Sequence, residues 1–344
     1  MSDTSTIKLL TFREVVRRRP GMYIGESGVE ALQQLIDEVA SNAIDQFLMG
    51  RASMLGVTVR DDGIEVRDDG PGMPFDIAGP EAGISLATHY LTTSHMTARA
   101  DDHAPHVHLH RIGGCGLAMV VAYSRRFVCD SWRNGLLWRQ SFTEGLPDAP
   151  PQIVAQGDGR GTVIELHPDE TVIGTGTPSH TLLRSTLFRA AHLFAGLRIE
   201  LDDEAFCAKQ GLADLLHLVT LRDGRWVDRP AFHWRGRHDG FDIEAAATGF
   251  GRADRRDCIW RTWVNGRSTL GDGTHRHGFA QALGYARWRP ANVMLHVIAH
   301  DPRFAGPTRD RYVSVPARAA VRQALKEPLD IYCRAQRIGR YAED

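Results

Sequence analysis

Two clusters of acidic, amide and glycine residues, about 25 residues apart, carry the chemistry that this sequence offers. In the first, Glu38, Asn42 and Asp45 are spaced i, i+4, i+7, which places all three on one face of a helix. The second, Asp68-Asp69-Gly70-Pro71-Gly72-Met73-Pro74, follows the alternating stretch Ile64-Glu65-Val66-Arg67. It predicts a strand that ends in a tight turn with a carboxylate at its base. A helix face opposite such a turn is what a nucleotide and its metal ion require.

The helix face has the groups that ATP hydrolysis needs. Asn42 offers a neutral oxygen to Mg²⁺, which prefers hard oxygen ligands. Glu38, one turn earlier, is able to accept a proton from a water that attacks near the γ-phosphate. Asp45 is placed to buttress the site or to meet water around the base. The alternative is a solvated helix face, because acids at this spacing are common.

The glycine turn suits an adenine base. The Asp68 carboxylate is an acceptor for the exocyclic amine of adenine, which distinguishes adenine from guanine. Gly70 and Gly72 allow backbone angles and a close approach that a Cβ would block. The alternative is an ordinary hairpin turn, as we expect for Asp61-Asp62-Gly63 just upstream. Asp68-Asp69-Gly70 differs because it continues into Gly72 and Pro74.

A third motif, Gly114-Cys115-Gly116, opens an apolar helix that we expect to run through Tyr123. A helix start of this kind presents backbone N–H groups and a positive dipole end to phosphates. Two glycines in this pattern are weak evidence alone, and their order after the two clusters gives them weight.

Composition describes an ordinary globular chain. The 344 residues are 42% hydrophobic and 24% charged, with 41 basic against 42 acidic residues, so there is no overall nucleic-acid-binding signature. Five scattered cysteines without a C-x-x-C pair predict reduced thiols and a cytoplasmic protein. The polar N-terminus and the lack of an apolar run of membrane-spanning length argue against secretion or membrane insertion.

Periodicity predicts alternating elements of both types. We expect helices at 28–49, 179–194, after 273 and from 315, and a loop over 83–111. We expect strands near 55–60, 64–67, 126–131, 136–142, 162–167, 198–202, 243–249, 258–264 and 292–299. The later elements predict a βαβ unit, beyond a domain boundary near 220–228.

These motifs, in this order, resemble the ATPase region of the DNA gyrase B subunit and its GHKL relatives. Arg18-Arg19-Pro20-Gly21-Met22-Tyr23-Ile24-Gly25 looks like the R-x-R-P-G-M-Y-I-G signature of the gyrase branch, and Asn42-Ala43-Ile44-Asp45 like its N-A-I-D. Gly161-Thr162 matches the G-T that closes the adenine pocket. Val264-Asn265-Gly266 and Gly273-Thr274-His275 look like the transducer domain that follows in this family.

The resemblance implies an α/β fold with two domains. Residues 1–217 would be a GHKL (Bergerat) ATP-binding domain, with a mixed sheet and helices on one face. Residues 218–344 would be a transducer domain of ribosomal-S5-like βαβ type. It also implies ATP and Mg²⁺ as ligands, a nucleotide-dependent homodimer, and a DNA topoisomerase function with DNA and a separate DNA-cleavage subunit as partners. The N-terminal arm is short and lacks an aromatic residue, so we expect weaker dimerisation.

The resemblance also assigns residues. Glu38 would be the general base, Asn42 the Mg²⁺ ligand, and Asp68 with Thr162 the adenine contacts. Arg309 would stand in for the lysine of the family's Q-T-K loop, although the two side chains differ in reach and geometry. Further residues would lie along the nucleotide: Asp45, Gly72, Met73, Pro74, Gly114, Cys115 and Gly116.

The chain departs from the family pattern around the phosphates more than around the base. Arg111 replaces the first glycine of the G-x-x-G-x-G lid, and Gln34 replaces a supporting histidine. Pro71 stands where the family has a basic residue and Gln46 where it has the acidic partner, so an ion pair is lost on both sides. An ATP-sensing module with little hydrolysis is therefore the alternative to an ATPase. No DNA-cleavage segment follows the transducer motifs, so we expect that the chain does not cut DNA alone.

Overall fold

The computed structural model divides the chain into two compact units. The first comprises Met1–Asp101, Ile112–Leu183 and Glu200–Glu204, and the second Asp102–Arg111, Arg184–Ile199 and Ala205–Asp344. The predicted boundary at residue 218 remains a prediction. The structure describes residues 10–25, 27–94, 106–107, 109, 116–222, 229–249, 258–270, 272–306 and 309–342. None of the helices in these ranges has the combined length and apolar character of a membrane span.

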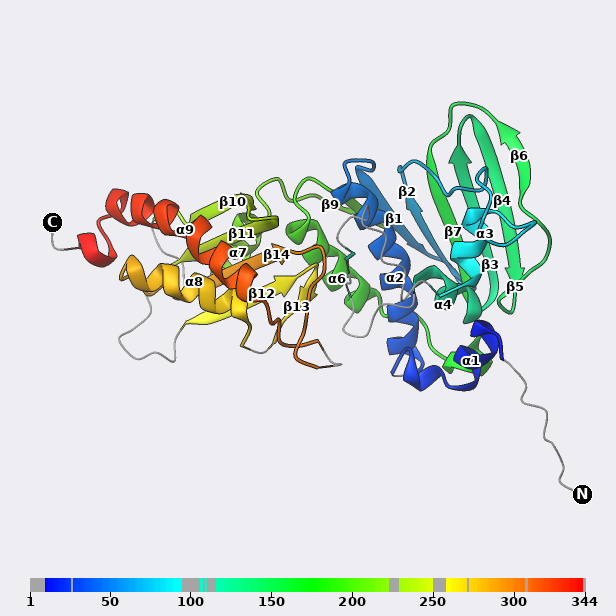
Figure 1. Ribbon diagram of the computed structural model, residues 1–344, viewed down its shortest axis with the longest axis horizontal. Helices are drawn as coiled ribbons and strands as arrows, with labels where there is room; N and C mark the ends of the chain where they lie inside the picture. Colours follow the sequence, from blue (N-terminus) through cyan, green and yellow to red (C-terminus); the bar gives the residue numbers. More distant parts are fainter. Residues whose placement is uncertain are drawn as a thin grey trace, which may run out of the picture. The chain divides into compact units, whose positions relative to one another are not determined.

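The first unit is built on a nine-stranded sheet with the order β5-β4-β3-β7-β2-β1-β8-β9, and β6 pairs with β4 (Figure 1). The long helix α2 packs against β1 and β2, and α4 packs against α2 and β3, so helices cover one face. The bounds are α1 (Phe12–Arg18), η1 (Pro20–Met22), α2 (Val29–Leu48), β1 (Met54–Val59), β2 (Ile64–Asp68), α3 (Leu86–Thr92), α4 (Gly116–Ala122), β3 (Ser124–Arg133), β4 (Leu136–Thr143), β5 (Leu146–Pro147), β6 (Gln152–Gln156), β7 (Gly161–Pro168), α5 (Glu170–Ile173), α6 (His180–Leu193), β8 (Arg198–Leu201) and β9 (Glu204–Phe206).

The helix α2 forms because apolar residues recur through it without a proline. Leu32, Leu35, Ile36 and Val39 are almost fully buried against the sheet and the neighbouring helices. Gly28 begins the helix with a φ of 67°, and its N–H donates to the Ile173 carbonyl at 2.7 Å. This left-handed turn is available to glycine at little cost. The predicted helix over 28–49 is therefore confirmed within one residue at each end.

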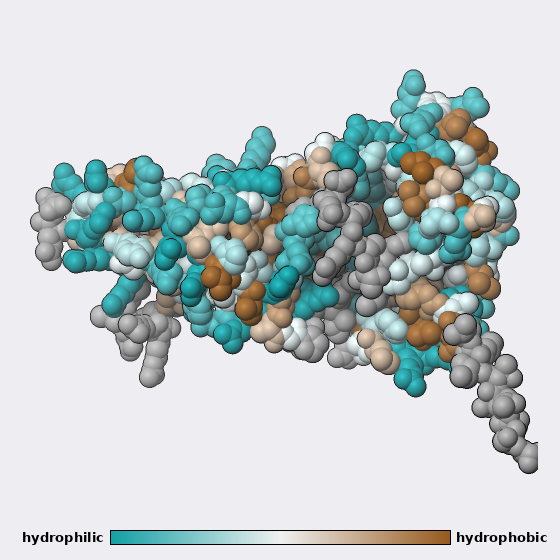
Figure 2. Space-filling model, viewed as in Figure 1, coloured by the Kyte–Doolittle hydropathy of each residue, from teal (hydrophilic) through white to brown (hydrophobic). Residues whose placement is uncertain are grey.

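The second unit is a five-stranded mixed sheet with the order β10-β11-β14-β12-β13. Strands β12 and β14 are parallel and are connected through α8, which confirms the predicted βαβ unit. The helices α8 and α9 pack on each other and share an apolar core with one face of the sheet, whereas α7 packs on β11 and β14 (Figure 1). Along α9 the surface is mainly hydrophilic (Figure 2). The bounds are α7 (Leu212–Arg222), β10 (Phe232–His238), β11 (Phe241–Thr248), β12 (Ile259–Val264), β13 (Arg267–Ser268), α8 (Thr274–Tyr285), β14 (Asn292–Ile298), α9 (Val315–Ala335) and η3 (Gly339–Tyr341).

The prediction of a loop over 83–111 was wrong at its start, where α3 forms. The Ser85 side chain accepts a hydrogen bond from the Thr88 N–H and caps this helix, and Ala87 and Leu91 are buried. The helix spans only two turns, so its apolar residues are too few to give a clear helical period in the sequence. Strands β5, β6, β9 and β10 and helix α7 were also missed, and most of the loop beyond residue 94 lies outside the described residues.

Candidate nucleotide site

The inner face of α2 is unusually polar for a buried helix. Glu38 and Asp45 share one face with Asn42 and are buried, and Asn42 alone between residues 31 and 45 keeps partial exposure; the buried Gln33 and Asp37 lie on another side of the helix. Buried acids and amides are costly unless they are paired or serve a site. The one accessible amide within this polar face therefore marks where the helix opens to a ligand.

The orientation of Asn42 fits an oxygen ligand for a cation. Its Nδ2 donates to the backbone carbonyl of Glu38 at 2.7 Å. Because the amide nitrogen is used in this bond, Oδ1 is the atom left to face outward. A neutral carboxamide oxygen is among the ligands that Mg²⁺ accepts, together with water and phosphate oxygens.

Three polar side chains form a row across neighbouring strands of the sheet. Asp68 in β2 pairs in register with Thr162 in β7, and Thr162 pairs with Ser131 in β3. Residues directly opposite in antiparallel strands have side chains on the same face. Asp68, Thr162 and Ser131 therefore lie side by side, and the two hydroxyl oxygens are 3.2 Å apart. The two adenine contacts predicted from sequence are thus neighbours.

Ser131 also holds the glycine turn. Its Oγ accepts a hydrogen bond from the Met73 N–H at 2.6 Å, while the side chain is fully buried. Gly72 has a φ of 78°, and a Cβ built on it would lie 1.9 Å from the Trp132 carbonyl oxygen. Only glycine allows this approach of the turn to β3. The turn is therefore fixed on the sheet beside Thr162.

The two adjacent aspartates of the turn differ in electrostatics. Burial raises the pKa of Asp68 from 3.8 to about 6, although the backbone N–H of Gly70, 2.7 Å from Oδ1, acts in the opposite direction. Burial also acts on the Asp69 pKa, but hydrogen bonds from Ser53 and from the Met54 N–H outweigh it and lower that pKa. Asp69 thus bonds the turn to the start of β1, whereas the Asp68 carboxylate is the candidate for contact with a ligand.

Contacts join the helix face to the turn. Gln46, one helical turn after Asn42, lies against Gly70: a Cβ on that glycine would be 3.5 Å from the Gln46 Cγ. Just after the helix, the Arg51 carbonyl accepts a hydrogen bond of 2.5 Å from the Arg160 guanidinium. Arg160 directly precedes Gly161 and Thr162. The polar face of α2 and the row of Asp68 and Thr162 therefore belong to one continuous region of the first unit.

The remaining predicted residues fall into three groups. Pro74 follows the turn and accepts the Ala87 N–H at 3.2 Å, and Gly116 begins α4 with a φ of 65°. Gly114 and Cys115 lie outside the described residues. Arg309 belongs to the second unit, where it adopts a φ of 52° and its N–H donates to Gly306.

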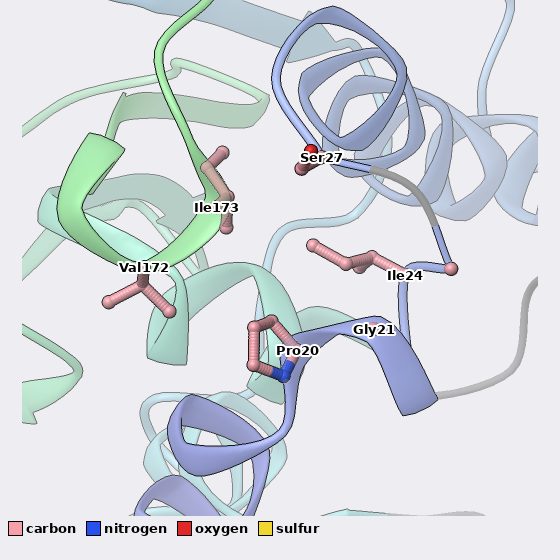
Figure 3. A pocket seen from close by; sticks show the side chains of 7 residues that line it. Pro20, Gly21, Ile24, Ser27, Val172 and Ile173 are labelled. Atoms are coloured by element: carbon pink, nitrogen blue, oxygen red, sulfur yellow. The ribbon is translucent and has the colours of Figure 1, made fainter.

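The R-P-G-M-Y-I-G motif lies at the start of the first unit and has a clear structural role. A cavity of about 150 Å³ separates Pro20 and Ile24 from Val172 and Ile173 (Figure 3). Ahead of the motif, Arg17 donates to the Asp169 carboxylate and to the Ala122 carbonyl, which joins α1 to α4 and α5. The motif thereby sets the position at which α2 begins.

The transducer-like motifs shape the second unit. Asn265 bonds both backbone groups of Ala299, at 2.8 Å each, and so links the ends of β12 and β14. His275 is fully buried at the start of α8, where burial lowers its pKa to about 3. Gly278 lets α8 meet α9, because a Cβ there would lie 2.4 Å from the Arg318 carbonyl. These residues are structural elements of the βαβ unit.

Ser131 is the site residue that the sequence did not suggest. It occupies an inward position of β3, two residues after the buried Cys129, where an apolar side chain would be usual. A lone serine on the buried side of a strand was the available signal. Its meaning depends on the register with β7, which the sequence alone does not reveal.

Comparison with known proteins agrees with this arrangement. Residues 28–172 match the family described as "Histidine kinase-, DNA gyrase B-, and HSP90-like ATPase". This part of the chain is therefore a domain of the GHKL ATPase type. It is 28% identical to the DNA topoisomerase 4 B subunit of Caulobacter vibrioides, over 96% of this chain and 52% of that protein. It is 34% identical to a DNA gyrase B subunit of Helicobacter pylori, over 95% of this chain and 45% of that protein.

The fold comparison extends over both units. The 43K ATPase domain of Thermus thermophilus gyrase B, solved in complex with an aminocoumarin, gives a TM-score of 0.81 at 26% identity. The match covers 98% of this chain and 94% of that domain. The predicted α/β class, with a GHKL domain followed by a transducer, is thereby confirmed. The chain spans about half the length of the curated relatives that it matches.

Proposed function

We propose that this chain binds ATP together with Mg²⁺ and hydrolyses it. The observation that carries the proposal is the register of Asp68 and Thr162 on neighbouring strands, joined through Gln46 and Gly70 to the helix that bears Glu38 and Asn42. Membership of an ATPase family supports it. The two clusters then serve opposite ends of one nucleotide.

Asp68 and Thr162 recognise the base in this proposal. The Asp68 carboxylate accepts the backbone N–H groups of Gly70, at Oδ1, and of Thr162, and its remaining lone pairs would accept the exocyclic amine of adenine. At neutral pH a carboxyl with a pKa of about 6 is mostly ionised and acts as an acceptor. Guanine presents a carbonyl oxygen at the same ring position and would meet this carboxylate unfavourably. The pocket therefore selects adenine.

Glu38 and Asn42 act at the phosphate end. Glu38 accepts the proton of the attacking water, and its burial near the start of the polar face keeps it out of bulk solvent. Asn42 contributes its Oδ1 to Mg²⁺, and the ion when bound neutralises charge that develops on the phosphate oxygens. The residues Asp45, Gly72, Met73, Pro74 and Gly116 line the path between the two ends.

The second part of the proposal is that ATP binding favours a closed dimer. ATP contacts made by Arg309 only in a closed, dimeric state would shift the population toward that state. The named relatives are subunits of DNA gyrase and topoisomerase IV, so we propose that the closed dimer acts on DNA topology together with DNA-cleaving segments or subunits.

Steady-state turnover with matched variants tests the proposal. Glu38→Ala should reduce kcat at least about a hundredfold, because a general base contributes a factor of this size, with little change in ATP affinity. Glu30→Ala is the control, since Glu30 is exposed on the first turn of the same helix. If the wild type binds ATP but shows no Glu38-dependent turnover, the chain is an ATP sensor. That outcome would be consistent with Gln46 and Pro71 replacing the acidic and basic residues of the family's ion pair. If it binds no ATP, the proposal is wrong.

A further inference from the structure

Four arginines line a hollow in the second unit, and none of them is among the residues that we assign to ATP. The hollow has a volume of about 340 Å³ and lies where the ends of α8 and α9 meet. No carboxylate is among the described residues that line it. These residues are Arg229, Arg287, Trp288, Arg289, Arg337, Ile338, Gly339 and Ala342.

The two turns that form the hollow are fixed to each other. The Arg340 N–H donates to the Ala286 carbonyl at 3.2 Å, and a Cβ on Gly339 would lie only 2.2 Å from that same oxygen. Trp288 and Ile338 are buried beneath the arginines, and the Trp288 indole N–H donates to the Gly249 carbonyl. The floor is therefore rigid and apolar, and the guanidinium groups are carried on a preformed frame.

Backbone conformation sets two of the arginines apart. Arg287 has a φ of 53° and Arg337 a φ of 50°, so both hold the left-handed conformation that glycine or asparagine adopts more easily. Strained residues of this kind concentrate at functional sites. A cation near the end of a helix also offsets the helix dipole. That explanation leaves out Arg229 and Arg289, which lie in no helix.

The acid Asp330, which contacts the turn after α9, is engaged by other groups. Asp330 accepts hydrogen bonds from Arg340 and from the Tyr341 hydroxyl, the latter at 2.7 Å. Neither Arg287 nor Arg337 forms an ion pair with any residue in the described ranges. The like charges of Arg287 and Arg337 at one hollow repel each other, and a multiply charged anion removes this repulsion.

We propose that this hollow binds a phosphate group. The guanidinium fork donates paired N–H bonds that match phosphate oxygens, and four arginines line this one space. The phosphate comes either from a free polyphosphate or from the backbone of a nucleic acid, and the site chemistry is shared by both.

Calorimetric titration of the full chain with sodium tripolyphosphate tests the proposal, in wild type and in the double variant Arg287→Asn/Arg337→Asn. Asparagine keeps the left-handed backbone without the charge. The charge-matched control is Arg237→Gln/Arg318→Gln, since both arginines are exposed in the same unit and do not line the hollow. We expect at least about tenfold weaker binding in the first variant and less than about twofold change in the control.

Hydrogen exchange localises the site and separates it from the ATP site. Tripolyphosphate should protect the amides of 286–289 and 336–341 in the wild type but not in the Asn variant. Equal losses in both double variants, or no protection of these two turns, would overturn the proposal.

A short DNA duplex identifies the phosphate source. If the duplex competes with tripolyphosphate and loses affinity in the Asn variant alone, the source is nucleic acid. If it does not compete while tripolyphosphate still protects the turns, the site takes a free polyphosphate.

Discussion

Replacing Asp68 by asparagine should stabilise the free protein while it weakens nucleotide binding. The folded carboxyl has a pKa of about 6 against an ordinary value of 3.8, so ionising it is harder in the folded than in the unfolded chain. At 1.36 kcal/mol per pKa unit, this difference costs about 3 kcal/mol of stability above pH 7. Asp68→Asn removes that cost, because the amide resembles the protonated acid and still accepts the Gly70 N–H.

The pH dependence follows from the direction of the shift. An acid whose folded pKa is raised binds its proton more tightly in the folded state, so stability is regained as pH falls through the folded value. At pH 5 the folded Asp68 is mostly protonated and the unfolded carboxyl is still ionised. The advantage of Asp68→Asn should therefore fall from about 3 kcal/mol at pH 7.5 to about half of that at pH 5.

The affinity should change in the opposite sense. With Oδ1 held by Gly70, the new NH₂ group faces the exocyclic amine of adenine, so two donors meet. A buried donor without an acceptor costs about 1 to 3 kcal/mol, which is roughly a tenfold to hundredfold loss of ATP affinity.

Urea denaturation at pH 5 and 7.5, with ATP calorimetry on the same samples, measures both effects. Asp61→Asn is the control, because Asp61 lies exposed in the preceding Asp-Asp-Gly turn. The reasoning is refuted if Asp68→Asn is less stable than the wild type at pH 7.5, or if its advantage does not change with pH. An unchanged ATP affinity would separately remove Asp68 from the adenine site.

Three further substitutions test the packing around the site and the crossover, each by urea denaturation. Gly72→Ala should destabilise by about 3 kcal/mol, because its Cβ meets the Trp132 carbonyl at a positive φ; a loss below about 1 kcal/mol would contradict the turn geometry. Asp69→Ala should cost about 2 kcal/mol at neutral pH through the loss of hydrogen bonds from Ser53, and the deficit should shrink as pH falls from about 3.8 through the lower pKa of the folded carboxyl, since the unfolded wild type takes up its proton first. Gly278→Ala should cost about 1 to 3 kcal/mol by separating α8 from α9, with ATP affinity unchanged; a neutral result would argue against their close approach.

The sequence predicted those parts of the site whose signals are local. The spacing of Glu38 and Asn42 depends only on helical period, and Asp68 is placed by a strand that ends in glycines. Short elements were missed where their period covers one or two turns, as in α3, or where exposed strands such as β6 lack an apolar pattern. Ser131 was missed for another reason: its role arises from the pairing of β3 with β7, which joins residues 31 positions apart.

The pair Asp68 and Asp69 shows why residue type alone did not assign the roles. Both are carboxylates in one turn, and from the sequence we assigned the adenine contact to Asp68 but gave no role to Asp69. In the fold, three hydrogen bonds reach Asp69 from Ser53 and Met54, so its charge is satisfied within the protein. Asp68 accepts fewer hydrogen bonds and is more buried, so its ionised form is less favourable in the folded than in the unfolded protein. A carboxylate that the protein itself does not satisfy gains most from a ligand donor, and the exocyclic amine of adenine supplies one. In the proposed complex, the electrostatic cost that Asp68 carries in the free protein would therefore become binding free energy.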